Sequence, residues 1–177
     1  PQVLRKGTAL ATDDAAAGSV ASCGFRTCYA VMPKPIEVIR SSVVTLNNLR
    51  QLDSFPHQHL VKSIVKLDLR CKAPHTAASL TVNELPFYLS GHQGLELHRL
   101  LSSHLRGICL TSADGTADQM LPPDMLDFRG FQEDDALLPG AQNANPGLVL
   151  LREYFLFPEK FLFVTVRGIA PEKLGTE

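Results

Sequence analysis

The sequence contains no excess of either charge. Its 177 residues include 17 Lys and Arg against 18 Asp and Glu, which gives a formal net charge of -1 at pH 7. A surface that binds nucleic acid needs excess cations to displace counterions from the phosphates, so the composition argues against a nucleic-acid-binding protein. No run of about 18 apolar residues occurs either, and we therefore expect no membrane-spanning helix.

Patterns that mark metal sites, catalytic nucleophiles and phosphate loops are also missing. There is no G-x-S-x-G elbow and no Walker or G-x-G-x-x-G spacing. His92, His98 and His104 are six residues apart, which does not place them on one helix face, so exposed histidines are predicted. The acidic run 133–135 predicts a solvated turn. We expect no catalytic residue, no metal ion and no cofactor.

The cysteines predict free thiols. None of the four forms a CxxC pair, and their spacing indicates no disulfide framework. We expect them to be reduced and mostly buried, as free cysteines usually are. They are Cys23, Cys28, Cys71 and Cys109.

Most of the chain has the pattern of β structure. Residues 65–72 are the clearest case, because four apolar side chains alternate with four charged ones and predict a strand with one buried and one solvated face. Further strands or short extended segments are predicted at residues 8–12, 25–31, 36–46, 80–89, 108–112, 119–121, 125–131 and 161–167.

Two segments have the pattern of helices. Leucines at i, i+3, i+4 and i+8 predict a helix over residues 93–106, followed by Gly107 as a C-cap. Asn145 as N-cap and Pro146 at the first position predict a second helix, which Pro158 ends. The fold class is therefore α+β, mainly antiparallel β-sheet or sandwich with about two helices.

Composition and chain ends bear on the organisation of the domain. With 45% apolar and 20% charged residues, the chain can form a substantial core. A polar segment near 47–59 predicts a linker between a β-rich subdomain, 1–50, and an α+β subdomain, 51–177. The sequence begins at Pro1 without Met or a signal-peptide pattern, so we expect a central piece of a longer protein.

Five of the twelve aromatic residues lie within ten positions. They are Tyr154, Phe155, Phe157, Phe161 and Phe163. We expect most of them to form core, where replacing Tyr154 or Phe157 by Ala would cost about 3–5 kcal/mol. The alternative is a surface that a partner covers, in which case subunit pairing would be lost while stability is kept.

The segment 151–163, LREYFLFPEKFLF, resembles the signature of the TssF family (also VasA or ImpG) of type VI secretion baseplate subunits. Other motifs of that family are matched in the same order. They lie at residues 7–8, 23–29, 35–38, 87–91 and 130–139. The chain departs from the pattern at Lys34, where a Trp is usual, and at Gly140, where an aromatic residue is frequent.

The resemblance implies a structural subunit of the baseplate wedge, without catalysis, that scaffolds sheath and tube assembly. It implies a cytoplasmic location at the inner-membrane-associated secretion apparatus of a Gram-negative bacterium. The implied partners are TssG-like, TssK-like and TssE-like subunits, together with a second copy of the chain as a pair, and neither nucleic acid nor a membrane span is implied. The candidate structural and interaction residues are Glu153, Tyr154, Phe155, Phe157, Pro158, Glu159, Lys160, Phe161 and Phe163.

Within this segment, Glu153, Glu159 and Lys160 are predicted to form polar contacts at the turn from helix to strand. Two other functions stay open from the residues themselves. A small-ligand-binding β-sandwich module would need a deep polar pocket. A hydrolase would need a Ser or a carboxylate pair beside a His in a cleft.

Overall fold

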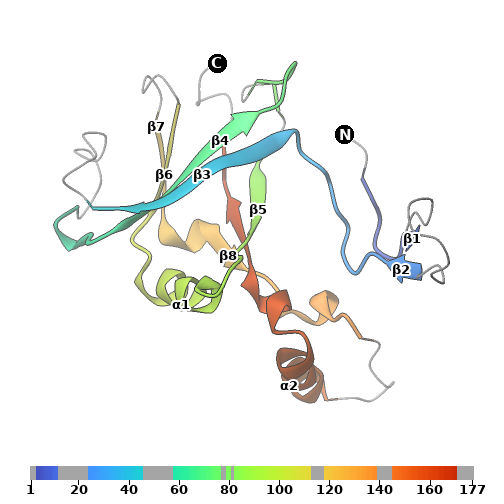
Figure 1. Ribbon diagram of the computed structural model, residues 1–177. Coiled ribbons are helices and arrows are strands. Elements are labelled where there is room, and N and C mark those ends of the chain that lie inside the picture. The colour runs from blue at the N-terminus through green and yellow to red at the C-terminus, as the bar shows by residue number, and fades with distance from the viewer. Residues whose placement is uncertain are drawn as a thin grey trace. The chain divides into compact units, whose positions relative to one another are not determined.

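The computed structural model describes residues 3–11, 24–45, 58–76, 79–80, 82–112, 118–138 and 145–170. The chain forms two compact units (Figure 1). The first comprises Pro1–Lys34 with Gly130–Lys160, and the second Pro35–Arg129 with Phe161–Glu177. Two α-helices and several small antiparallel sheets confirm the α+β fold class.

This division differs from the one expected from the sequence. Strands β3 (Ile36–Val44) and β4 (Ile64–Cys71) pair with each other in the second unit. A boundary near 47–59 would place them in separate subdomains. Most of 47–59 lies outside the described residues.

The core of the second unit surrounds strand β9 (Phe163–Arg167). This strand lies between β5 (Glu84–Tyr88) and β8 (Leu126–Phe128) in an antiparallel sheet of order β5-β9-β8. Its β-branched residues suit a central position, and Val164 and Thr165 are buried there. The buried apolar residues of the described chain all belong to this unit: Val82, Leu121, Leu126, Phe161, Val164 and Ile169.

Shorter elements complete the second unit. Strands β6 (Ile108–Thr111) and β7 (Asp118–Leu121) form an antiparallel pair, and 3-10 turns η4 (Gln58–Leu60) and η5 (Pro123–Met125) lie in the connections. Helix α1 (Gly94–His104) begins close to the backbone of Leu89. The predicted C-cap at Gly107 is wrong, because the helix ends at His104 and Leu105 is its C-cap.

The ribbon of β3 and β4 shows the predicted alternation of side chains. Its charged face holds Glu37 close to Arg70 and Lys72, at 3.9 and 3.7 Å. On the other face, however, Val65, Leu67 and Leu69 remain exposed. The period of two is therefore confirmed, whereas the expected burial of the apolar face is not found within this ribbon.

The first unit has less regular structure. Strands β1 (Ala9–Ala11) and β2 (Gly24–Arg26) form an antiparallel pair. The 3-10 turn η6 (Glu133–Asp135) precedes helix α2 (Pro146–Leu156), and η7 (Pro158–Leu162) follows the helix and leads into β9. The N-cap prediction is confirmed, since the Asn145 side chain accepts a hydrogen bond from Gly147 N at 2.9 Å.

Candidate functional site

The corner between α2 and η7 is set by backbone chemistry. Phe157 N donates to Glu153 O at 2.7 Å and closes the last turn of the helix. Pro158 has no N–H to continue the helical ladder, and Lys160 N instead donates to Phe157 O at 3.0 Å. The chain therefore turns sharply after Phe157, and Glu153 and Lys160 lie on the inside of the turn.

These two residues form a buried ion pair. Lys160 Nζ donates to Glu153 Oε2 at 2.5 Å, and the second carboxylate oxygen accepts from Leu137 N and Leu138 N, both at 2.9 Å. We call Glu153, Lys160, Leu137 and Leu138 the corner cluster. It joins three separate stretches of the first unit through one carboxylate.

The corner cluster also determines the charge state of Glu153. Burial by itself raises the pKa of this carboxyl. The hydrogen bonds from Leu138 N, the Lys160 ammonium and Leu137 N together outweigh burial and bring the pKa below its ordinary value. Glu153 is therefore ionised at neutral pH, although its side chain has no contact with solvent.

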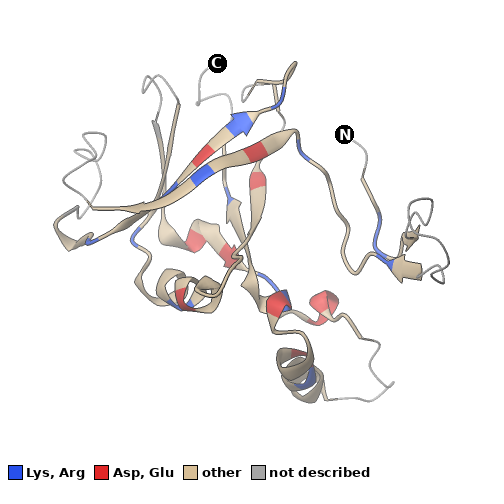
Figure 2. Ribbon diagram, in the orientation of Figure 1, with Lys and Arg blue, Asp and Glu red and all other residues tan. Residues whose placement is uncertain are grey.

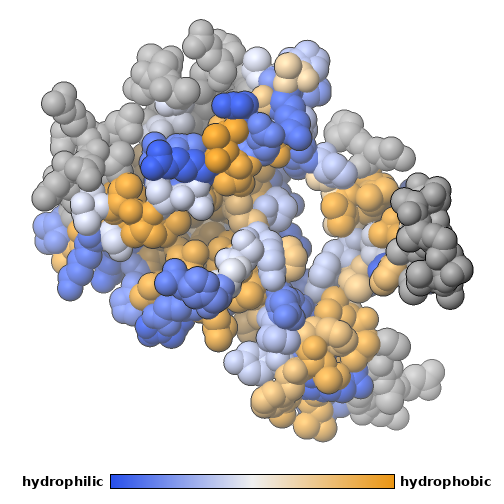
Figure 3. Space-filling model, viewed as in Figure 1, coloured by the Kyte–Doolittle hydropathy of each residue, from blue (hydrophilic) through white to orange (hydrophobic). Residues whose placement is uncertain are grey.

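Helix α2 exposes five of its large apolar residues. Leu148, Leu151 and Phe155 occupy positions i, i+3 and i+7 and so share one face, with Tyr154 and Leu156 beside them. Their exposed fractions are 66%, 53%, 74%, 47% and 57%, respectively. We call these five residues the α2 outer face. Apolar surface gathers over this helix in the space-filling view (Figure 3). Val149 and Leu150 lie on the other side of the helix and are half-buried, so α2 is apolar on both sides and exposes one of them.

This arrangement changes the interpretation of the aromatic cluster. Core burial was expected for most of its five members, and that is wrong, because Phe161 alone of the five is buried. The physical reason is that the inward side of α2 is occupied by Glu153, which leaves the neighbouring rings on the outside. The alternative, a surface that a partner covers, is the one the exposure favours.

The other candidate residues separate into two groups. Of the three residues predicted to form polar contacts, Glu153 and Lys160 pair with each other, whereas Glu159 is exposed. Pro158 is also exposed. Phe163 belongs to the second unit, where its ring lies 4.9 Å from that of Tyr88.

Sequence reasoning missed part of this site. The sequence analysis does not include three leucines of α2 among its candidates: Leu148, Leu151 and Leu156. The signal was available, because a helix that is apolar on all sides is usually buried on all sides. Leu137 and Leu138 lie within the matched family motif at 130–139, but the motif does not show which of their groups act. They act through backbone N–H groups, which every residue except proline possesses.

Motif residues near the N-terminus have structural roles in the same unit. Thr27 Oγ1 donates to Arg5 O at 2.7 Å and accepts from Thr8 N at 3.0 Å. Tyr29 Oη donates to the backbone oxygen of Asp135 at 3.0 Å. The Asp135 carboxylate accepts from Gly130 N at 2.8 Å and is buried. The prediction of a solvated turn is therefore wrong at Asp135, although Glu133 and Asp134 are exposed.

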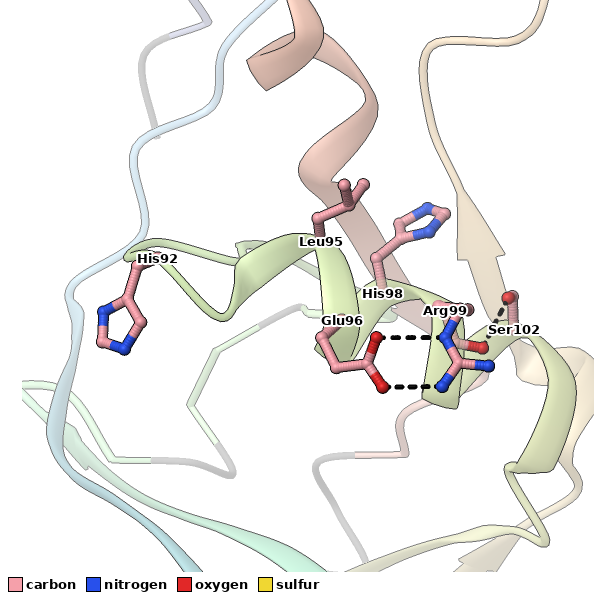
Figure 4. Close-up of a pocket in the computed structure, with 6 residues that line it drawn as sticks. All are labelled: His92, Leu95, Glu96, His98, Arg99 and Ser102. Carbon is pink, nitrogen blue, oxygen red and sulfur yellow. Dashed lines mark hydrogen bonds and ion pairs between the residues drawn. The ribbon is translucent and has the colours of Figure 1, made fainter.

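The second unit contains an open depression on helix α1 (Figure 4). All of its lining residues come from α1 and the turn just before it, so no second element closes it over. Glu96 is engaged by Arg99 through two hydrogen bonds of 2.6 and 3.0 Å. This is not the deep polar pocket that a ligand-binding module would need.

The environments of His98 and of the cysteines differ from those expected from the sequence. His98 is half-buried, contrary to the expected exposure, and its ring packs edge-on against Phe128 at 4.8 Å. Burial lowers the pKa of His98 and raises the pKa of Cys71. The expected burial of the cysteines is not found among those described: Cys28 is exposed, and Cys71 and Cys109 are half-buried. Cys23 lies outside the described residues.

Two features are absent from the described residues. In that part of the chain, no group of three or more His, Cys, Asp or Glu is placed to hold a metal ion. No helix there is long and apolar enough to span a membrane.

Comparison with known proteins identifies the family. The family model described as "Type VI secretion system, TssF" matches residues 1–176, nearly the whole chain. The chain belongs to the TssF family. A curated relative, type VI secretion system component TssF1 of Pseudomonas aeruginosa, is 32% identical over 155 residues, which cover 84% of this chain and 24% of the relative.

The fold has a solved counterpart. It is similar, with a TM-score of 0.73 and 23% sequence identity, to a chain in the structure of a type VI secretion system TssK-TssF-TssG baseplate subcomplex. The match covers 99% of this chain and 31% of the other. The chain thus spans about a quarter of the curated TssF relative and about a third of the solved chain.

Proposed function

We propose that this chain is a structural, non-catalytic part of the type VI secretion baseplate wedge, and that it scaffolds sheath and tube assembly through protein contacts. Membership of the TssF family supports the proposal. The described residues also offer surfaces for contact, whereas the depression on α1 lacks the enclosure that a substrate site needs.

The observation that supports this function best is the exposed apolar surface of α2. An exposed helix with five large apolar side chains on its outer face is costly to leave in water. Apolar patches of this kind, next to polar residues, are typical of surfaces that another protein covers. We propose that Tyr154, Phe155 and Phe157 contact a neighbouring subunit, and that Glu153 and Lys160 hold them in position.

The proposed partners are the TssG-like and TssK-like subunits, because the solved structure with the similar chain is a TssK-TssF-TssG subcomplex. A TssE-like subunit and a second copy of the chain are further partners in the proposed wedge. The proposed location is the cytoplasmic side of the inner-membrane-associated secretion apparatus.

Co-purification with the matching TssG subunit tests the proposal. The chain and a tagged TssG subunit would be co-expressed, captured through the tag and analysed by light scattering for stoichiometry. A stable complex with a defined mass is expected. A well-folded chain that remains monomeric and is not captured by TssG or TssK would contradict a scaffolding contact within these residues.

A further inference from the structure

A single cation lies within the α2 outer face. Arg152 is the one basic residue of α2, visible as its blue stretch in Figure 2. It follows Leu148 by four positions and precedes Phe155 by three, so all three side chains emerge on the same face. Arg152 is itself exposed. The apolar surface therefore has a positive charge inside its boundary.

This charge has no anion beside it in the part of the chain that the structure describes. The ion pairs found there do not include Arg152. Its neighbour Glu153 points to the inside of the corner and is engaged by Lys160. If an apolar surface covered Arg152 without a counter-ion, the buried guanidinium would lose its hydration uncompensated. We therefore expect a protein that covers this face to supply an acceptor for the guanidinium, and a carboxylate is the strongest one.

The size of the face suits a protein partner. Its five apolar side chains expose roughly 600 Å², at the upper end of the largest apolar patch on an ordinary monomer. A standard interface buries about 800 Å² on each partner. Because Tyr154 and Leu156 flank the helix on opposite sides, one partner covers part of this area, and the face supplies a portion of one side of such an interface.

The face is also held in place before any partner arrives. The corner cluster fixes the last turn of α2 through a buried ion pair and two backbone hydrogen bonds. The Tyr154 and Phe155 rings pack edge-on, with centroids 5.6 Å apart. A surface ordered in advance loses less conformational entropy on binding.

We infer that another baseplate subunit binds the α2 outer face with an apolar segment of its own, and that this segment places an Asp or Glu against Arg152. This inference rests on the proposed function. A second copy of the chain fits less well. A symmetric contact centred on this face would bring two Arg152 guanidiniums together without an anion between them.

The experiment measures binding of the 177-residue chain to the matching TssG and TssK subunits, each alone and as a co-expressed pair. Two variants probe the face. Phe155→Ser removes its most exposed ring, and Arg152→Met removes the charge but keeps an apolar side chain of similar length. Phe25→Ser and Arg5→Met are matched controls, because both residues are exposed in the same unit and lie in other segments. Circular dichroism and thermal melting confirm that each variant folds.

Phe155→Ser is expected to weaken binding about 30-fold, the effect of losing a hot-spot side chain. Arg152→Met is expected to weaken it at least about tenfold, because the partner's carboxylate is left without its cation. The two controls should bind like the wild-type chain.

Each other outcome overturns the inference in a distinct way. If Arg152→Met binds as well as the wild type or more tightly, no carboxylate faces this position. If neither variant weakens binding, the docking surface lies elsewhere while the proposed function stands. A wild-type dimer that Phe155→Ser dissociates would place a second copy on the face. If the wild type binds neither subunit, the proposed function fails, and the inference fails with it.

Discussion

Lys160 Nζ lies 2.5 Å from Glu153 Oε2, and the two side chains are 2% and 0% exposed. Removing two charges from water costs several kcal/mol per ion, which their attraction repays only when the geometry and the remaining hydrogen bonds are good. Here the backbone N–H groups of Leu137 and Leu138 donate to the second oxygen of the Glu153 carboxylate and so complete its hydrogen bonding. The pair therefore acts mainly to fix one geometry of the corner.

Glu153→Gln should destabilise the chain by about 3–5 kcal/mol at pH 7. The amide oxygen can still accept from the two backbone N–H groups, but Lys160 is left as a buried cation without an anion. Urea unfolding followed by circular dichroism measures the change. Glu159→Gln is the matched control on the same corner, and because Glu159 is exposed it should stay within about 0.5 kcal/mol of wild type. Equal stabilities for the two variants would contradict the role of the buried pair.

The stability conferred by Glu153 should depend on pH in one direction. Its pKa in the folded chain is below the ordinary value of about 4.3, so the unfolded chain takes up the proton first as the pH falls. The contribution is complete above about pH 5 and is lost as the pH falls from about 4.3 through the folded-state pKa. Unfolding free energies of wild type and Glu153→Gln should therefore converge in acid. A gap that stays constant or widens as the pH falls below about 4.3 would refute this.

The two ends of the aromatic cluster should respond differently to truncation. Phe161 is buried in the core of the second unit, and Phe161→Ala should cost about 3–5 kcal/mol. Phe155 is exposed, and Phe155→Ala should change the unfolding free energy by no more than about 0.5 kcal/mol. The urea midpoints of the two variants decide the matter. A large loss for Phe155→Ala would mean that its ring packs inside the isolated chain.

Gly94→Ala should destabilise the start of α1, although alanine favours helix by up to about 1 kcal/mol. A Cβ at this position would collide with the backbone oxygen of Leu89, which cannot move without disturbing the chain before the helix. We expect a net loss of about 1–3 kcal/mol in the thermal or urea unfolding of the variant. Gly24→Ala is the control, because nothing lies within 4 Å of a Cβ placed on Gly24. A more stable Gly94→Ala chain would show that the helix shifts freely.

Local patterns were predictable because their causes lie within a few residues of the chain. The Asn145 cap and Pro146 start α2 where expected, since an N-cap needs only its own side chain and the N–H two residues later. The alternation along β4 was predictable for the same reason, as the pleat sets which side chains share a face. The family was predictable from the EYF and FPEKF motifs, which the family match confirms.

Burial at the candidate site was not predictable in this way. A lone carboxylate in an apolar helix usually points to water. The sequence therefore suggests that Glu153 lies on the outside of α2 and that the aromatic rings beside it lie in the core. The tertiary structure reverses this at Glu153, which accepts from Leu137, Leu138 and Lys160. Two of these donors are main-chain groups that no sequence pattern marks.

The sequence by itself determined the fold class, the ends of α2, the periodicity of its strands and the family. Each follows from local backbone preferences or from a contiguous motif. Only the tertiary structure decided which side of α2 faces inward. That choice depends on where residues 137–138 and Lys160 meet Glu153, since an ionised carboxylate can be buried only where enough donors converge on it. Once Glu153 points inward, helical geometry leaves Leu148, Leu151 and Phe155 on the outside.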